Sequence, residues 1–133
     1  MMTAVEVFAS FIDQINAHDV DGLCELMSED HLFVDSLGRS IRGREGTRKA
    51  WEAYFSLFPD YAIACEETIQ RADLVIGAGT ARGTYLVDGL LFPENGWEIP
   101  AAWKAIVEDG RIAEWRVYAD NDPVRRIMAA PKK

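Results

Sequence analysis

The stretch HLFVDSLGRSIRGREGTRKAWEAYFSLF, residues 31–58, determines how the rest of the chain is arranged. Its pattern predicts a short strand that ends at Asp35, a polar turn, and then a helix from about Arg44 to Leu57. Aromatic side chains recur three and four residues apart along this helix and form one stripe, made of Trp51, Tyr54, Phe55 and Phe58. An acid beside an aromatic wall indicates a small apolar pocket with one polar group.

The chain as a whole is predicted to be a single domain, residues 1–133, with a core that needs no disulfide or metal. Its net charge of −8 disfavours nucleic acid and anionic membrane surfaces as partners. The N-terminal stretch has acids among its apolar positions and no basic flank, so we expect neither a signal peptide nor a membrane span. Cys24 and Cys65 lie in apolar segments without a CxxC motif, which indicates reduced thiols in a cytoplasmic protein.

Helical and strand patterns divide the chain into two parts. A capping box at Thr3 and Glu6 begins the first of three predicted N-terminal helices, and one early strand lies among these helices. From residue 61 onward the pattern predicts four antiparallel strands, the last two joined by a turn at residues 108–110. Helices followed by strands indicate an α+β fold, in which a curved antiparallel sheet wraps around the three helices.

Three glycines lie on one face of the predicted strand from Leu74 to Val87: Gly77, Gly79 and Gly83. Glycines on one face leave room for a helix, a ligand or a bend. The segment GAGTARG is not a dinucleotide-binding fingerprint, because its spacing is wrong and no helix follows.

Three segments of the chain resemble a known superfamily: NAHDVDGLCELMSEDHLFVDSLG (16–38), RGREGTRKAWEAYFSLFPD (42–60) and VEDGRIAEWRVYAD (107–120). They are similar to the nuclear transport factor two-like superfamily, and within it to the SnoaL-like polyketide cyclase and ketosteroid isomerase group. The resemblance runs from about Val5 to Asp120. It implies a cone-shaped, cystatin-like α+β barrel with a deep apolar pocket, usually in a homodimer. Because this superfold hosts isomerases, cyclases, epoxide hydrolases, dehydratases and binding proteins, it implies no single reaction.

The resemblance implies that this chain keeps only some of the functional residues of the family. Asp35 falls where ketosteroid isomerases place their proton-shuttling base. The oxyanion-binding tyrosine of those enzymes falls at Phe11, and their protonated aspartate falls at about Trp103, so the resemblance implies that this oxyanion hole is absent. Cyclases and limonene epoxide hydrolases keep an acid on the last strand, where this chain has Val117, and Asp120 has the opposite strand parity.

Asp35 is the best candidate for a catalytic residue. A carboxylate in an apolar cavity has its charged form disfavoured, which suits a general base near neutrality. The alternative is that Asp35 only stabilises its turn. Tyr54, the only phenol in the helix stripe, is the second candidate, as a proton donor or polar contact. His31 lies roughly 13 Å along the strand from Asp35 and is expected to be a solvent-edge or satisfied histidine.

The predicted substrate-binding residues are Phe11, Phe33, Trp51, Phe55, Trp103, Trp115 and Val117. Two histidines without an H-x-x-x-H pattern predict no metal site, and no motif calls for a cofactor. Two hypotheses follow. The first is a cofactor-independent isomerase, cyclase, dehydratase or hydrolase in which Asp35 acts on a small hydrophobic molecule. The second is a non-catalytic binder of a small apolar ligand, or a dimeric assembly module.

Overall fold

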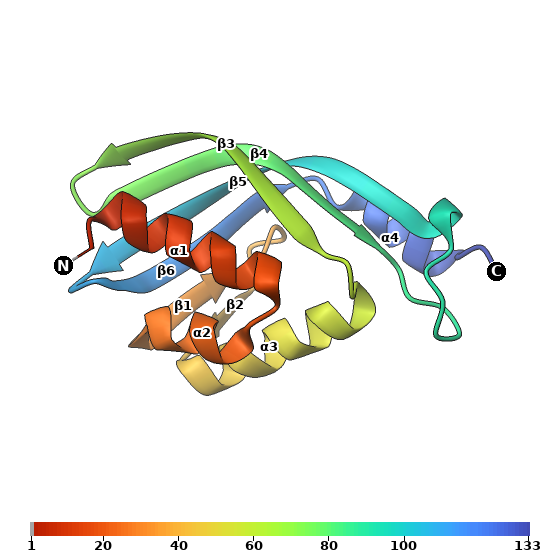
Figure 1. Ribbon diagram of the computed structural model, residues 1–133, viewed down its shortest axis with the longest axis horizontal. Coiled ribbons are helices and arrows are strands. Elements are labelled where there is room, and N and C mark those ends of the chain that lie inside the picture. The colour runs from red at the N-terminus through yellow and green to blue at the C-terminus, as the bar shows by residue number, and fades with distance from the viewer. Residues whose placement is uncertain (1) are drawn as a thin grey trace.

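The computed structural model describes residues 2–133, which form one curved sheet with three helices in its hollow and a fourth near the C-terminus (Figure 1). In chain order the elements are α1 (Ala4–Ala17), α2 (Val20–Leu26), β1 (Met27–Val34), β2 (Ser40–Arg42), α3 (Arg44–Leu57), β3 (Ala62–Arg71), β4 (Leu74–Thr84), a 3-10 turn (Pro93–Asn95), β5 (Gly96–Glu108), β6 (Arg111–Ala119) and α4 (Asp122–Ala129). The predicted α+β class and cone shape are confirmed.

The sheet is mixed, so the prediction of a purely antiparallel sheet is wrong at one pair of strands. The strand order is β2-β1-β6-β5-β4-β3, and every neighbouring pair is antiparallel except β1 and β6, which are parallel. A hairpin forces two strands to be antiparallel, whereas β1 and β6 are joined by a long connection that permits the parallel arrangement. The sheet stays open, with β2 and β3 at its two edges.

The early strand is longer than predicted and has a partner that the sequence did not reveal. The polar residues Ser28 to Asp30, expected to be a break, lie inside β1, where the pairing with β6 is interrupted between Met27 and Leu32. The predicted turn region contains β2, which pairs antiparallel with the end of β1. The extension of β1 arises from long-range pairing with β6, which the local pattern does not encode. The pairing of β2 with β1 is short-range, across the turn between residues 34 and 40, and the sequence pattern did not identify it.

Local signals set the helices as expected. The Thr3 hydroxyl accepts a hydrogen bond from the Glu6 amide, and the Glu6 carboxylate accepts one from the Thr3 amide, so the predicted capping box is present. The α1 side chain Phe8 fills the space left by Gly77, because a Cβ there would lie 2.6 Å from the Phe8 ring. The glycine face of β4 therefore receives a helix at this position.

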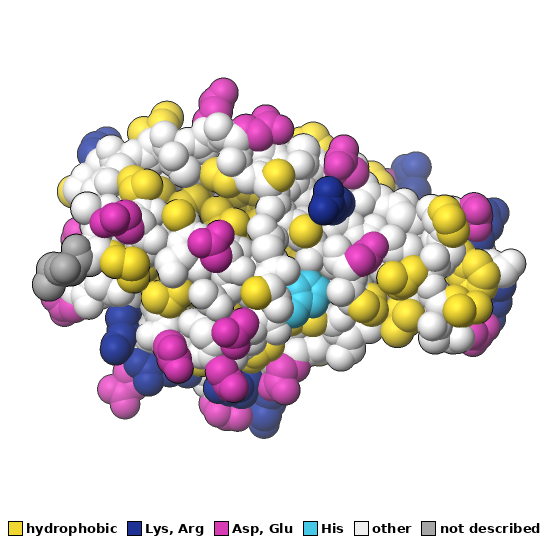
Figure 2. Space-filling model, in the orientation of Figure 1, with side chains coloured by type: hydrophobic (Ala, Val, Ile, Leu, Met, Phe, Trp, Pro, Cys, Tyr) yellow, Lys and Arg dark blue, Asp and Glu magenta, His cyan; other side chains and the backbone are white. Residues whose placement is uncertain are grey.

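Acidic side chains are common on the surface (Figure 2), as expected from the negative net charge of the sequence. Figure 2 shows acidic side chains spread over the face that it draws, and hydrophobic side chains gathered toward the end where β4 connects to β5. Within residues 2–133, no helix has the length and apolar character that a membrane crossing requires. Cys24 and Cys65 are both free thiols.

Candidate functional site

The aromatic stripe of α3 exists as predicted and meets aromatic side chains from other elements. Along the helix, the ring centroids of Trp51 and Phe55 lie 5.4 Å apart. Trp51 also contacts Phe11 of α1, with centroids 6.4 Å apart, and Phe33 of β1, at 5.8 Å, both edge to face. Such pairs add to the stability gained from burial alone. The fold thus brings together residues that are distant in the sequence.

Side chains on the concave face of the sheet pack against these aromatic residues. Trp115 of β6 packs against Phe8 and Phe11, with ring centroids 5.3 and 4.6 Å apart. Trp103 of β5 pairs with Val117 in register, and Trp115 pairs with Phe33. All of the predicted substrate-binding residues belong to the hydrophobic core or pack directly against it: Phe11, Phe33, Trp51, Phe55, Trp103, Trp115 and Val117.

Burial decreases along both β1 and β6 in the same direction. On β1 the side chain of His31 is fully buried and that of Phe33 is half-buried, and just beyond the strand the side chain of Asp35 is 30% exposed. On β6 the side chain of Trp115 is fully buried and that of Val117 is half-buried. Because the two strands are parallel, side-chain exposure increases toward the same end of the sheet on both of them. The exposed rim of the concave interior therefore lies at the end near Asp35.

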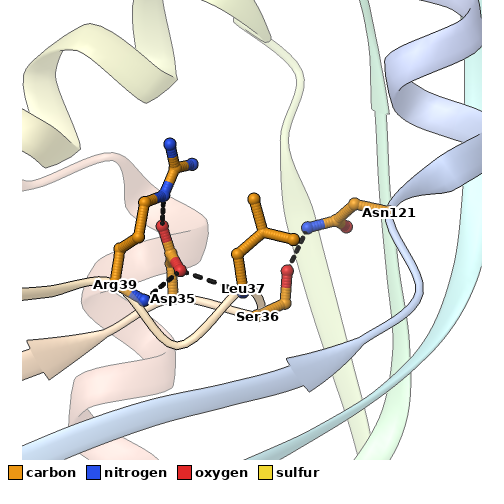
Figure 3. A network of polar contacts seen from close by, with 5 residues as sticks. All are labelled: Asp35, Ser36, Leu37, Arg39 and Asn121. Atoms are coloured by element: carbon orange, nitrogen blue, oxygen red, sulfur yellow. Dashed lines mark hydrogen bonds and ion pairs between the residues drawn. The ribbon is translucent and has the colours of Figure 1, made fainter.

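The Asp35 carboxylate is held inside the turn between β1 and β2 (Figure 3). Its Oδ1 accepts hydrogen bonds from the amides of Leu37 and Arg39, both at 2.9 Å, and its Oδ2 accepts one from Arg39 Nε at 3.0 Å. Next to it, the Asn121 amide group donates to the Ser36 hydroxyl and ties this turn to the start of α4. The turn-stabilising role of Asp35 is therefore present, and Oδ2, which accepts from Arg39 Nε, keeps a second lone pair that can take up a proton.

Tyr54 lies within the aromatic stripe, about one helical turn after Trp51. Its ring packs against Phe58 and Tyr61, with centroids 5.0 and 4.9 Å apart. Burial raises the pKa of the Tyr54 phenol, so the hydroxyl stays protonated at neutral pH and can donate a hydrogen bond. Asp35 has its polar partners in its own turn, so the structure gives these two predicted catalytic residues separate surroundings.

The sequence predicts a solvent-edge or a satisfied histidine at His31, and the structure shows a buried ring with one nitrogen facing a backbone carbonyl. Its side chain is fully buried rather than at a solvent edge, and its Nδ1 lies 2.7 Å from the carbonyl oxygen of Ile112. Burial lowers the pKa of the imidazole. Strand alternation already placed His31 on the same face as Phe33. What the sequence lacked was the parallel β1–β6 pairing, which covers this histidine.

The other polar candidates serve the fold. His18 lies 2.7 Å, through Nε2, from the carbonyl oxygen of Tyr61, and its ring stacks on Phe55 at 4.0 Å. Asp120 accepts a hydrogen bond from the Asp122 amide at the start of α4, and its exposure agrees with the predicted outward parity.

The surface of the molecule carries two shallow depressions outside the aromatic interior. One is lined by Glu66, Glu67, Ala78, Gly79, Pro100, Ala101, Ala102 and Tyr118. The other is lined by Asp60, Arg82, Gly83, Thr84, Gly96, Trp97 and Glu98. Neither includes Asp35 or the α3 stripe. In the part of the chain that the structure describes, no group of three His, Cys, Asp or Glu side chains is placed to hold a metal ion.

Residues 8–115 match the family model of the SnoaL-like domain. A search of curated proteins finds no match to the chain. Many solved structures share its fold. A protein of Shewanella putrefaciens assigned to the SnoaL-like polyketide cyclases is 18% identical, with a TM-score of 0.81, and the match covers 97% of this chain and 87% of that one.

Two further solved structures extend this likeness. IdmH of Streptomyces antibioticus, assigned as a polyketide cyclase, is 24% identical, with a TM-score of 0.79 and coverage of 97% of this chain and 100% of IdmH. A Catenulispora acidiphila protein with a ketosteroid isomerase-like fold, solved with trimethylamine, is 17% identical, with a TM-score of 0.78 and coverage of 97% and 96%. At these identities the likeness establishes the fold.

Proposed function

Because the chain belongs to the SnoaL-like domain family, we propose that it binds a small apolar molecule between the α3 stripe and the concave face of the sheet. The supporting observation is the interior itself, which is lined by flat aromatic side chains and becomes more exposed toward one end of β1 and β6. Small-molecule sites are typically concave and mostly apolar, with a few polar groups. No cofactor is part of this proposal.

Ligand binding can be followed through the indole N–H signals of the four tryptophans. We expect 2-methoxynaphthalene, a flat apolar probe, to shift the two-dimensional NMR signals of Trp51 and Trp115. The signal of Trp97 should stay in place, because Trp97 packs against Phe58 and Tyr61 at the end of the stripe opposite Trp51. Unchanged signals at saturating probe, or a shift confined to Trp97, would contradict the proposal.

A matched pair of variants locates the entrance. Val117→Arg places a charge on the half-buried rim, and we expect it to abolish the probe-induced shifts, because burying an unpaired charge beside the ligand is costly. Tyr118→Arg changes the neighbouring residue, which is exposed and has the opposite parity, and should leave binding intact. Circular dichroism would establish that both variants are folded.

The second candidate function is acid–base catalysis by Asp35, which is favoured by the position of this carboxylate at the rim of the proposed site. Once a substrate is found, Asp35→Asn is expected to lower kcat by about a hundredfold, since an amide cannot take up the proton. The variant should remain folded, because its side-chain oxygen still accepts the two backbone amides. Turnover equal to that of the wild-type protein would leave Asp35 with its turn-stabilising role alone.

Arg39→Ala separates the two roles of Asp35. It removes the guanidinium from Oδ2 and leaves both backbone amides on Oδ1. If Asp35 is the base, turnover should be kept or increased in this variant, because one donor no longer competes for the carboxylate. The ion pair is largely exposed on its arginine side, so little stability is at stake.

We also propose that two copies associate through the convex face of the sheet. Ile69 and Ile76 face each other across β3 and β4 and are 73% and 42% exposed, and Tyr118 on the same face is 47% exposed. Ile76→Lys is expected to shift the protein from dimer to monomer in sedimentation velocity, because it places a charge in an apolar contact. Leu90→Lys, at an exposed position in the β4–β5 connection, is the matched control. A monomeric wild-type protein at the same concentration would overturn this proposal.

A further inference from the structure

Three buried polar atoms without a hydrogen-bond partner belong to side chains whose rings all lie near the ring of Phe11. They are Nε2 of His31, Nε1 of Trp51 and Nε1 of Trp115. The ring centroids of these three side chains lie 6.3, 6.4 and 4.6 Å from that of Phe11. Buried polar groups are nearly always paired, so a cluster of unpaired ones calls for a specific explanation.

The His31 atom is a hydrogen-bond acceptor. A backbone carbonyl can only accept, so the 2.7 Å contact with Ile112 requires the proton to be on Nδ1. In the neutral ring, the other nitrogen then carries a lone pair. The lowered pKa that burial gives this imidazole supports the neutral form. Nε2 is thus a fixed acceptor inside an apolar interior.

The two indole groups are donors. Trp51 is 7% exposed and Trp115 is fully buried, and an indole N–H can only donate. Trp97 shows that an unpaired buried indole is not unique to this place, since its N–H is also unpaired. The distinguishing feature is the combination near Phe11, where one unpaired acceptor and two unpaired donors belong to rings that share this neighbour.

We propose that His31 Nε2, together with the indole N–H groups of Trp51 and Trp115, receives the hydroxyl group of a neutral, ring-containing ligand. This inference rests on the proposed function and adds the polar group that the ligand must carry. His31 lies at the closed end of the exposure gradient, with Phe33 and then Asp35 toward the rim. The ligand therefore enters with its hydroxyl first, and its apolar body lies along the aromatic wall.

The donor and acceptor types select this chemistry. A hydroxyl can donate to the lone pair of His31 Nε2 and accept from indole N–H groups with the same oxygen. An ether or ketone has no proton for His31, and a carboxylate would place a charge against the lone pair without a cation to balance it. Phe11, Phe33 and Trp51 are flat aromatic side chains, and such side chains pack favourably against a planar ring system.

The test compares 2-naphthol with 2-methoxynaphthalene, which share a ring system and differ in the hydroxyl proton. The chain has only two histidines, and the nitrogens that hold their protons differ: His31 through Nδ1 and His18 through Nε2, each facing a carbonyl oxygen. In protein labelled with ¹⁵N-histidine, we expect 2-naphthol to shift the His31 Nε2 signal toward the hydrogen-bonded range and to leave His18 unchanged. We expect 2-methoxynaphthalene to bind about tenfold more weakly, with no such shift.

The variants separate His31 from the aromatic packing. His31→Phe keeps a ring of similar size and removes the acceptor, so it should bind the two probes equally. Trp51→Phe should weaken 2-naphthol selectively, and Trp97→Phe, which removes an equally unpaired indole from another part of the core, should not. If His31→Phe does not fold, the wild-type nitrogen shift decides the matter alone.

The outcomes separate this inference from the proposed function. If both probes bind equally and the His31 Nε2 signal does not move, the hydroxyl site is wrong while ligand binding stands. A water molecule held permanently at Nε2 would give this result. If neither probe binds, the proposed function and the hydroxyl site both fail.

Discussion

Replacing Gly79 with alanine is expected to lower the free energy of unfolding by about 3 kcal/mol, because the added carbon has no room. A Cβ at this position would lie 1.8 Å from the carbonyl oxygen of Ala64 and 2.9 Å from its carbonyl carbon. Both atoms belong to the backbone, so no side-chain rotation can relieve the clash. Either β3 or β4 must move, and both are held by ladder hydrogen bonds.

The strand pairing explains why the space is so limited. Gly79 pairs with Cys65, and the register between β3 and β4 shifts between Cys65 and Glu67. Such a bulge pushes the backbone of one strand toward its neighbour, and glycine is the residue that permits this approach.

Urea unfolding followed by circular dichroism measures the loss. Ala78→Gly, at the exposed neighbouring position, is the matched control and should cost no more than about 1 kcal/mol. A Gly79→Ala protein whose unfolding free energy falls within that same margin of the wild-type value would mean that the bulge can relax.

Trp115→Ala is expected to cost about 3 to 5 kcal/mol, which is a large fraction of the stability of a domain of this size. The indole is fully buried and packs against Phe8 and Phe11, so alanine leaves a cavity at the centre of the core. Trp115→Phe should cost much less. It keeps an aromatic ring in the site, and the N–H that it removes has no partner to lose.

Comparing the two substitutions by urea unfolding separates packing from hydrogen bonding at this position. Equal losses in Trp115→Phe and Trp115→Ala would contradict this account, because they would mean that the indole N–H makes an important hydrogen bond. Near-ultraviolet circular dichroism checks that the phenylalanine variant keeps a rigid aromatic core.

Local features of the sequence were sufficient to predict much of the fold. The capping box at Thr3 and the bounds of α3, Arg44–Leu57, agree with the structure. The hairpin between β5 and β6 is also present at the predicted turn. These features depend on residues within a few positions of one another, so propensity and periodicity describe them. The pairing of β1 with β6 depends on residues far apart, and the local pattern missed it. The short strand β2 was missed although it pairs nearby, because its three residues lie in a stretch that reads as a polar turn.

The candidate site was predictable in part for the same reason. The alternation of apolar and polar residues predicted which strand faces point inward. In agreement with this, Trp103 and Trp115 are both buried in one core. The surroundings of single polar groups could not be predicted in this way. Arg39 holds Asp35, and Ile112 holds His31. Such contacts depend on turn geometry and strand register, which alternation does not specify.

The parallel pairing of β1 with β6 also determines when the chain can fold. The hydrogen bond between His31 and Ile112 joins residues 81 positions apart, and contacts of such long range slow folding, because the loop must close first. Helix α1 can already pack against β3, β4 and β5 while β1 is still without its parallel partner. The central strand β6, which joins the two halves of the sheet, is the last strand to be made. Folding is therefore expected to finish with β6, whose addition joins β1 and β2 to the other strands of the sheet.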